Sequence, residues 1–485
     1  MDHLETPAVH RLLTSPAGRF STSRPFEAFK TRALPREFAV VRARAAADVA
    51  LSEGPEAYLR EVGAPPAPHL HDRIERALAR YARLRGAYDE TMDRWERVFW
   101  GDDESTPDER VAVERERREV SERRAKPTDI FGFLSKEHLV PPVKFETPSP
   151  EDARTRWHHE LAEPERLYGF AESSAAEEFP RVERSATVRG PGTVEYLLRF
   201  RSPSPHLSDR ATARVYEPVD TDANAGGDAD LPTLVFHSGW GTFDDQLGYW
   251  PEEEYVARAL APEGYRVVLP DAPWHGRREL LGRYSGEPYI ARAPVGLFTL
   301  YSAAALETAV LTDWARTEGA PVVGVGGVSL GGTIALHVGG RCGDWPESMR
   351  PDLLFPVGMP GAIDQTLLSG ELTRLLDIDD ALDAAGWTGA ALHEFAPLLN
   401  PPKDPCLAPE RVFPFVGTRD EMAPASTARA LLDEWGVPRP NRREWDCGHF
   451  GVLATLIRDE SFRTTVRREL VAAARNRRNR GSVTA

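Results

Sequence analysis

The stretch Val322-Val-Gly-Val-Gly-Gly-Val-Ser-Leu-Gly-Gly-Thr-Ile-Ala-Leu336 decides how the rest of this sequence can fold. It opens with β-branched residues in a short uncharged run, which is typical of a strand buried on both faces of a sheet. A G-x-S-x-G turn centred on Ser329 follows, and mostly apolar residues continue beyond it as a helix. Because this motif has meaning only between a strand and a helix, the context makes Ser329 a candidate nucleophile.

The glycines on either side of Ser329 have a physical purpose in such a turn. They leave room for a strained central residue, so that the serine hydroxyl stands clear of the backbone. The amides that follow belong to a helix N-terminus, where an oxyanion is stabilised. The alternative is an ordinary glycine-rich turn of a parallel sheet, in which Ser329 is merely a small residue.

Strand and helix patterns alternate on both sides of this stretch. The expected strands are residues 194–200, 211–216, 233–236, 265–269, 352–358, 411–416 and 443–446. The expected helices are residues 252–260, 300–317, 426–435 and 452–475. The first two strands suit an antiparallel pair, and the alternation after them predicts an α/β fold, with a mainly parallel central sheet flanked by helices.

Residues from about 190 to 475 resemble the α/β-hydrolase superfamily in its serine esterase and lipase-like form. Besides the G-x-S-x-G turn, the resemblance rests on two loops, Val416-Gly-Thr-Arg-Asp-Glu-Met-Ala-Pro424 and Cys447-Gly-His-Phe-Gly451. The family implies a Ser…Asp/Glu…His order, with each residue on a loop after a strand. It therefore implies a catalytic set of Ser329, Asp420 and His449.

These residue types suit nucleophilic catalysis. A serine hydroxyl is a weak nucleophile until an imidazole accepts its proton, and a carboxylate fixes the tautomer of that imidazole. Glu421, next to Asp420, and the more distant Asp404 are alternatives for the acid. Standing alone, His449 would suit a capping or core role; the order of the three candidates favours the catalytic one.

His237-Ser-Gly-Trp-Gly241 resembles the family's oxyanion loop, with the usual His-Gly pair split by Ser238. The resemblance implies that the amides of Leu330 and of Trp240 or Gly239 stabilise the oxyanion. His237 itself, and His275 in the loop after the next strand, are expected to be structural.

The remaining parts of the chain are expected to be mostly helical. Residues 1–145 are expected to form a highly charged helical segment, and residues 146–185 a linker with short helices. The hydrolase-like domain is expected to span residues 186–475 and to carry a helical cap insert at 362–408. Residues 476–485 are expected to be a flexible tail. Thr6-Pro7 is a helix start, and an amphipathic helix runs from Ile74 to Phe99. Thr106-Pro107 begins a helix rich in Glu and Arg, which is expected to be solvated; a partner-binding helix is the alternative.

Composition excludes several classes of protein. The net charge of −15 argues against a nucleic-acid surface and against attraction to anionic lipid. Three cysteines without C-x-x-C spacing indicate neither a disulfide framework nor a zinc ribbon. No signal-peptide pattern and no long apolar run for a membrane span is visible, so a cytoplasmic location is expected.

In Trp157-His-His-Glu160, adjacent side chains point in different directions, so no metal is expected there.

Together these patterns predict a serine hydrolase that cleaves a carboxylic ester of a small-molecule acyl substrate through an acyl-enzyme intermediate, without metal or cofactor. A peptidase or an acyltransferase on the same fold is one alternative, because a fold does not fix a reaction. A non-catalytic binding or scaffold protein that uses the charged N-terminal helices is the other.

Overall fold

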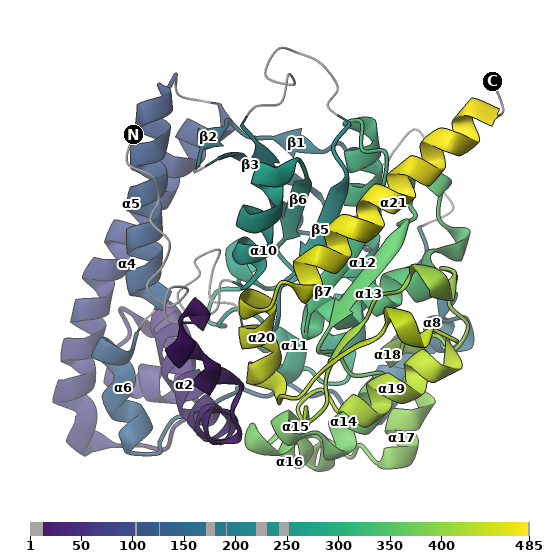
Figure 1. Cartoon of the computed structure of the whole chain (residues 1–485). Helices are drawn as coiled ribbons and strands as arrows, with labels where there is room; N and C mark the ends of the chain where they lie inside the picture. The colour runs from purple at the N-terminus through teal and green to yellow at the C-terminus, as the bar shows by residue number, and fades with distance from the viewer. Residues whose placement is uncertain are drawn as a thin grey trace.

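A ten-stranded sheet organises the molecule (Figure 1). The computed structural model describes residues 13–101, 104–125, 127–170, 180–190, 192–219, 230–241 and 252–483. The strands are β1 Glu183–Arg184, β2 Val188–Arg189, β3 Thr193–Arg201, β4 Arg210–Pro218, β5 Thr233–His237, β6 Arg266–Pro270, β7 Val323–Val328, β8 Leu353–Val357, β9 Phe415–Gly417 and β10 Arg443–Trp445. Their order is β1-β3-β4-β6-β5-β7-β8-β9-β10, with β2 on β3.

The sheet has an antiparallel beginning and a parallel body. β3 pairs antiparallel with β4, and β4 pairs antiparallel with β6. From β6 through β5, β7, β8 and β9 to β10, every pair is parallel. The predicted α/β fold class is confirmed, and a serine turn after a central parallel strand places the chain in the α/β-hydrolase type of fold. β9 is shorter than expected, since only an isolated bridge at Val412 precedes it.

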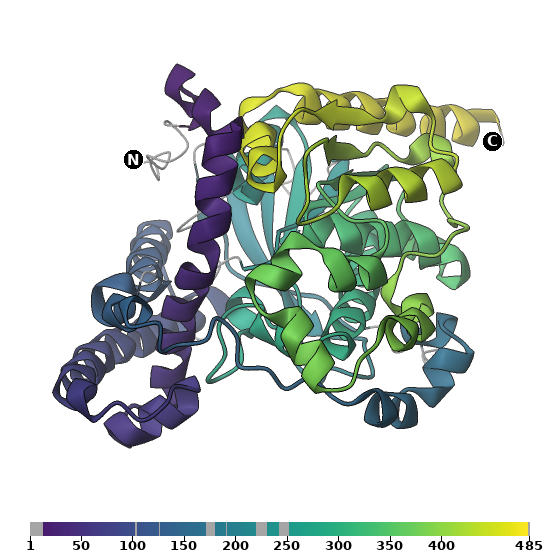
Figure 2. The same cartoon turned by 90° about the horizontal axis from the view of Figure 1, so that it is seen from below.

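Helices cover both faces of the sheet (Figures 1 and 2). α10 Glu252–Leu260 and α21 Ser461–Val483 lie on one face, and α12 Val295–Thr317 and α13 Leu330–Arg341 lie on the other. Phe462 of α21 packs edge-on against Phe236 of β5 and Phe415 of β9, at 5.5 and 5.2 Å between ring centroids. By length and composition α12 could cross a membrane, but 94% of its most apolar window is buried, so it packs as a core helix.

The N-terminal segment is helical, as predicted. Its helices are α2 Arg24–Ala50, α3 Pro55–Val62, α4 His71–Trp100, α5 Pro107–Ala125 and α6 Thr128–Lys136. They enclose an apolar cluster of their own, which includes Tyr58, Tyr81 and Phe131. The expected helix start at Thr6-Pro7 lies outside the described residues. α2 contributes to this cluster and also runs alongside the hydrolase-like part of the molecule (Figure 2).

The prediction of a solvated helix after Thr106 is wrong for one face of α5. Glu114 and Arg117 are buried there, with 5% and 0% of their surface exposed. The Glu114 carboxylate accepts hydrogen bonds from Trp95 and Arg117, and it pairs with Arg214 of β4 at 3.2 Å. Buried charges are tolerated when they are paired and hydrogen-bonded, so hydropathy alone could not reveal this face.

Short helices fill the segments expected to be linker and cap. They are α7 Pro150–Arg156, α8 His158–Ala162 and α9 Glu165–Tyr168, then α14 Ile363–Ser369, α15 Glu371–Leu375, α16 Ile378–Ala384, α17 Gly389–Glu394 and α18 Ala396–Leu399. Two further helices, α11 Glu287–Ala291 and α19 Ala425–Glu434, lie within the hydrolase-like part. Trp157 and Tyr168 from the first group are buried in the main core, so this segment packs on the sheet domain.

The single helix expected over residues 452–475 is wrong. α20 His449–Arg458 ends before Asp459, and α21 begins at Ser461. The Asp459 carboxylate accepts a hydrogen bond from the Ser461 amide at 2.6 Å, so it caps the second helix. α21 then continues to Val483, through most of the residues expected to form a flexible tail.

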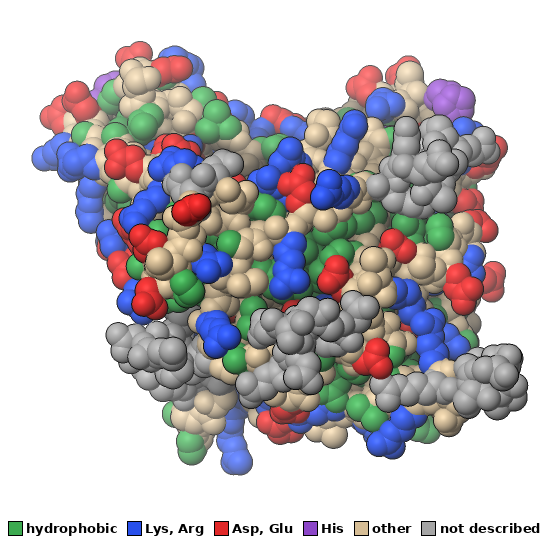
Figure 3. All heavy atoms as spheres, turned by 90° about the horizontal axis from the view of Figure 1, so that it is seen from above, with side chains coloured by type: hydrophobic (Ala, Val, Ile, Leu, Met, Phe, Trp, Pro, Cys, Tyr) green, Lys and Arg blue, Asp and Glu red, His purple; other side chains and the backbone are tan. Residues whose placement is uncertain are grey.

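Charges of both signs are mixed on the surface. On the face shown in Figure 3, Lys and Arg side chains alternate with Asp and Glu over the described residues. Many are paired across elements, as in the bond from Arg154 of α7 to Glu394 of α17 at 2.9 Å.

Candidate active site

Ser329 occupies a strained turn between β7 and α13. Its φ of 56° with ψ of −113° lies in a region that non-glycine residues rarely adopt. The Ser329 amide donates to the carbonyl oxygen of Val357 at 2.8 Å, which holds the turn against β8. A side chain on Gly327 would lie 2.5 Å from the backbone of Gly331, so only glycine fits there.

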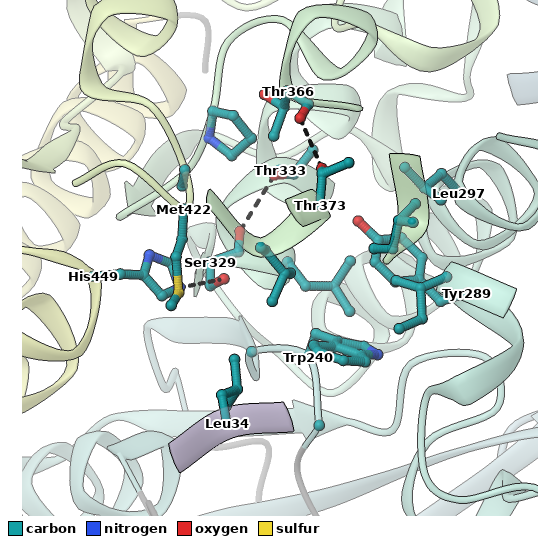
Figure 4. Close-up of a pocket in the computed structure, with 18 of the residues that line it drawn as sticks. Leu34, Trp240, Tyr289, Leu297, Ser329, Thr333, Thr366, Thr373, Met422 and His449 are labelled. Atoms are coloured by element: carbon teal, nitrogen blue, oxygen red, sulfur yellow. Dashed lines mark hydrogen bonds between the residues drawn. The ribbon is translucent and has the colours of Figure 1, made fainter. Parts of the chain in front are cut away.

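The structure brings together the three residues expected to be catalytic. Figure 4 shows two of them, Ser329 and His449, facing each other. Ser329 Oγ lies 3.0 Å from His449 Nε2. His449 Nδ1 lies 2.7 Å from Asp420 Oδ2, and Asp420 has only 2% of its surface exposed. Asp420 Oδ1 accepts hydrogen bonds from the amides of Met422 at 3.1 Å and Ala423 at 2.8 Å. The carboxylate is therefore fixed from behind while its other oxygen faces the imidazole.

Neither alternative acid takes this place. Glu421 and Asp404 are both exposed, whereas Asp420 is buried against His449. The backbone of Glu421 contacts α15, because its carbonyl oxygen accepts a hydrogen bond from the Glu371 amide at 3.1 Å.

The environment of His449 favours its protonated form. Burial by itself would lower the pKa of the imidazole, but the charge of Asp420 and its hydrogen bond act in the opposite direction. Glu27 and Glu371 add further negative charge, and the net result is a pKa raised above the ordinary 6.5. His449 is therefore a better proton acceptor than a solvent-exposed histidine.

The residues expected to form the oxyanion hole surround Ser329. Leu330 is the first residue of α13, and the first-turn amides of a helix have no acceptor within the helix. A side chain on Gly239 would lie 3.7 Å from Ser329 Cβ, so the backbone of the oxyanion loop passes directly beside the serine. Trp240 stacks on Phe38 of α2 with centroids 4.4 Å apart, and its indole donates to the Gly286 carbonyl oxygen.

His237 and His275 are buried supports. His237 Nε2 lies 2.8 Å from the Thr308 hydroxyl, and burial lowers the pKa of His237 to about 3. His275 Nδ1 lies 2.9 Å from the Pro273 carbonyl oxygen, and burial lowers its pKa to about 4. Both imidazoles are neutral at physiological pH. His237 ties the end of β5 to α12, and His275 braces its own loop.

A cavity of about 190 Å³ opens beside Ser329 and His449. Figure 4 shows Trp240, Tyr289 and Leu297 on one side of it and Met422 next to the histidine. Its lining is mostly apolar, with Leu34, Phe38, Ile290, Leu330, Ile363, Leu367, Leu372, Ile378, Phe450 and Leu453 among the other residues.

Sequence reasoning missed the contribution of α2 to this cavity. Lys30, Leu34, Glu37 and Phe38 line it, and all four come from the N-terminal segment. The Lys30 ammonium lies 3.2 Å from the Glu37 carboxylate, so the charges in this wall are paired. Burial lowers the pKa of Lys30, and Glu37 opposes that effect. Lys30 stands among apolar residues of α2, which is a signal that can be seen in the sequence. Nothing in the neighbouring residues indicates that Lys30 faces the cavity.

No metal centre is evident in the part of the chain that the structure describes, since no group of three His, Cys, Asp or Glu residues lies close enough to hold an ion. In the segment considered for one, the His158 and His159 rings lie 3.8 Å apart, and both residues are exposed.

Several solved structures are similar to this chain. Brefeldin A esterase, described as a bacterial homologue of human hormone-sensitive lipase, is 16% identical over 70% of this chain and 89% of its own, with a TM-score of 0.38. Esterase B from Lactobacillus rhamnosis is 16% identical over 68% and 97%, with a TM-score of 0.38. The acylaminoacyl peptidase of Pyrococcus horikoshii is 13% identical over 60% and 48%, with a TM-score of 0.38.

No protein-family model and no curated protein matches this sequence. Structural likeness at these values does not establish an activity, so the chemistry has to be argued from the geometry around Ser329.

Proposed function

We propose that this protein is a serine hydrolase that cleaves carboxylic esters through an acyl-enzyme intermediate. One observation carries the proposal. Ser329 Oγ, His449 and Asp420 form a continuous hydrogen-bonded chain, with links of 3.0 and 2.7 Å, beside an apolar cavity. This is the arrangement that converts a serine hydroxyl into a nucleophile.

The first half of the reaction forms the acyl-enzyme. His449 Nε2 accepts the proton of Ser329 Oγ while that oxygen attacks the ester carbonyl carbon. The carbonyl electron pair moves onto oxygen, where the amides of Leu330 and of Gly239 or Trp240 stabilise the negative charge. The imidazolium then gives its proton to the departing alcohol oxygen as the carbon–oxygen bond breaks.

The second half uses the same groups with water. His449 takes a proton from a water molecule as its oxygen attacks the acyl carbon, and then returns a proton to Ser329 Oγ as the acid leaves. Asp420 accepts from Nδ1–H throughout, so that Nε2 always faces the serine. The amides of Met422 and Ala423 hold the carboxylate in that orientation.

The cavity favours a substrate with an apolar acyl or alcohol group. Its walls offer aromatic and aliphatic side chains, and its charged residues Lys30 and Glu37 neutralise each other. Each Å² of apolar surface buried on binding contributes about 25 cal/mol. We therefore expect kcat/KM to rise with the length of an unbranched acyl chain until the cavity is filled.

Labelling with a fluorophosphonate tests the proposal directly. Wild-type protein is expected to be labelled and to hydrolyse p-nitrophenyl esters, whereas Ser329→Ala and His449→Ala should do neither. Ser369→Ala, which removes an exposed hydroxyl on α14, serves as the matched control and should behave as wild type. Full ester hydrolysis by folded Ser329→Ala would refute the assignment, and faster cleavage of matched amides than of esters would favour a peptidase.

A further inference from the structure

A residue near the N-terminus bonds to the backbone directly after the candidate base. Glu27 of α2 accepts a hydrogen bond from the Phe450 amide at 3.0 Å and from the Gly451 amide at 3.1 Å. Each carboxylate oxygen takes one of the two bonds. Phe450 and Gly451 follow His449 in the first turn of α20, which begins at His449 itself.

These two amides need an acceptor from outside their own helix. The first N–H groups of a helix have no partner within it, and an N-cap side chain usually supplies one. The N-cap of α20 is Gly448, which has no side chain to do so. A Cβ atom at Gly448 would lie 2.5 Å from the Glu27 carboxyl carbon, so the glycine also makes room for Glu27.

A carboxylate suits this place electrostatically as well. The N-terminus of a helix carries a partial positive charge, which an anion stabilises. Asp420 and Glu371 of α15 also act on the imidazole of His449. Lys30 lies 5.6 Å above the Phe450 ring and is paired with Glu37.

We propose that Glu27 is a positioning residue for His449, acting as the N-cap that α20 lacks. It fixes the first turn of α20, and with it the backbone from which the imidazole reaches between Ser329 and Asp420. The inference rests on the proposed function for its catalytic consequence. It makes the N-terminal segment a structural part of the active site, because α2 also supplies one wall of the cavity.

Two substitutions of Glu27 test the contributions of its charge and of its hydrogen-bond acceptors. Glu27→Gln removes the charge and keeps one of the two oxygen acceptors, whereas Glu27→Ala removes the charge and both acceptors. We expect kcat to fall about tenfold in Glu27→Ala, and less in Glu27→Gln, with KM nearly unchanged, because the loss is one of geometry at the base. Glu53→Gln, at an exposed carboxylate just beyond α2, is the matched control and should keep wild-type kcat. Wild-type kcat in folded Glu27→Ala would overturn the proposal.

A second measurement needs no substrate. The imidazole of His449 can be titrated by NMR in ¹⁵N-histidine-labelled protein, and among the 13 histidines its signal is the one lost in His449→Ala. Because Glu27 is among the groups that raise the pKa of His449, we expect a lower pKa in Glu27→Gln than in wild type. An unchanged titration would overturn the coupling, whether or not the protein hydrolyses esters. If ester hydrolysis did not depend on Ser329 but the pKa of His449 still fell in Glu27→Gln, only the proposed function would be refuted.

Discussion

The α-carbon of Gly331 lies so close to the backbone of His237 that a side chain on it would come within 2.3 Å of the His237 carbonyl oxygen. The two residues belong to the helix that follows the serine and to the end of β5. Their contact sets how closely the serine turn packs against the end of β5.

Gly331→Ala should therefore disable the site. We expect the added methyl group to push α13 away from β5, to cost about 1–3 kcal/mol in the free energy of unfolding, and to abolish labelling of Ser329. Urea denaturation and fluorophosphonate labelling would measure the two effects. Gly86→Ala is the control: Gly86 lies inside α4 with nothing within 4 Å of the added carbon, so this change should stabilise the protein by about 0.5–1 kcal/mol.

Asp420→Asn tests the orienting carboxylate. The amide cannot accept from Nδ1–H as a charged group does, so the imidazole loses both its fixed tautomer and its stabilising charge. We expect kcat to fall by about 10³–10⁴-fold with little change in the folded structure. Glu421→Gln, at the exposed neighbouring carboxylate, should leave kcat nearly unchanged. A larger fall in kcat in Glu421→Gln than in Asp420→Asn would identify Glu421, and not Asp420, as the orienting carboxylate.

The pH dependence of ester hydrolysis follows from the raised pKa of His449. A raised pKa means that the imidazole stays protonated to a higher pH, and only the neutral form can accept the serine proton. We expect kcat/KM to be full at alkaline pH and to fall as the pH drops through a value above the ordinary 6.5. A profile measured across about pH 5–9 would show this limb; a midpoint below the ordinary value would contradict the electrostatic account.

Leu34→Trp tests whether α2 limits the substrate. Leu34 is a buried residue of the cavity wall, so the larger ring would shorten the space available to an acyl chain. We expect kcat/KM for long-chain esters to fall about tenfold or more while short esters are hydrolysed as before. Phe29→Trp, on the same helix but with 64% of its surface exposed, should change neither. Equal losses for all chain lengths would indicate general damage to the site.

Much of the fold could be predicted because its signals are local. The strands of the parallel sheet are short apolar runs, and the helix start at Thr106-Pro107 lies in consecutive residues. In the structure, the Thr106 amide donates to Glu109 at 2.8 Å and the Glu109 amide donates to the Thr106 hydroxyl at 3.3 Å. Ser329, Asp420 and His449 could be proposed because the resemblance to the α/β-hydrolase superfamily implies this order of residues, each on a loop after a predicted strand.

The errors arose where distant or polar contacts decide the structure. The buried face of α5 is made of ion pairs, which hydropathy reads as solvent-facing. The break between α20 and α21 depends on a contact of the Asp459 side chain with the Ser461 amide, and apolar residues recur on both sides of it. The place of α2 could not be predicted, because Glu27 and Lys30 meet the site only once the whole sheet has formed.

The bond from Phe450 to Glu27 also has a consequence for the order of events during synthesis. The two residues are 423 positions apart, so at about 5–20 residues per second α20 follows α2 out of the ribosome by about 20 to 90 s. Throughout that interval Glu27 has no α20 amides to accept from, and His449 has not yet been synthesised. A nascent chain of this protein therefore completes the contact between α2 and α20 only near the end of its synthesis.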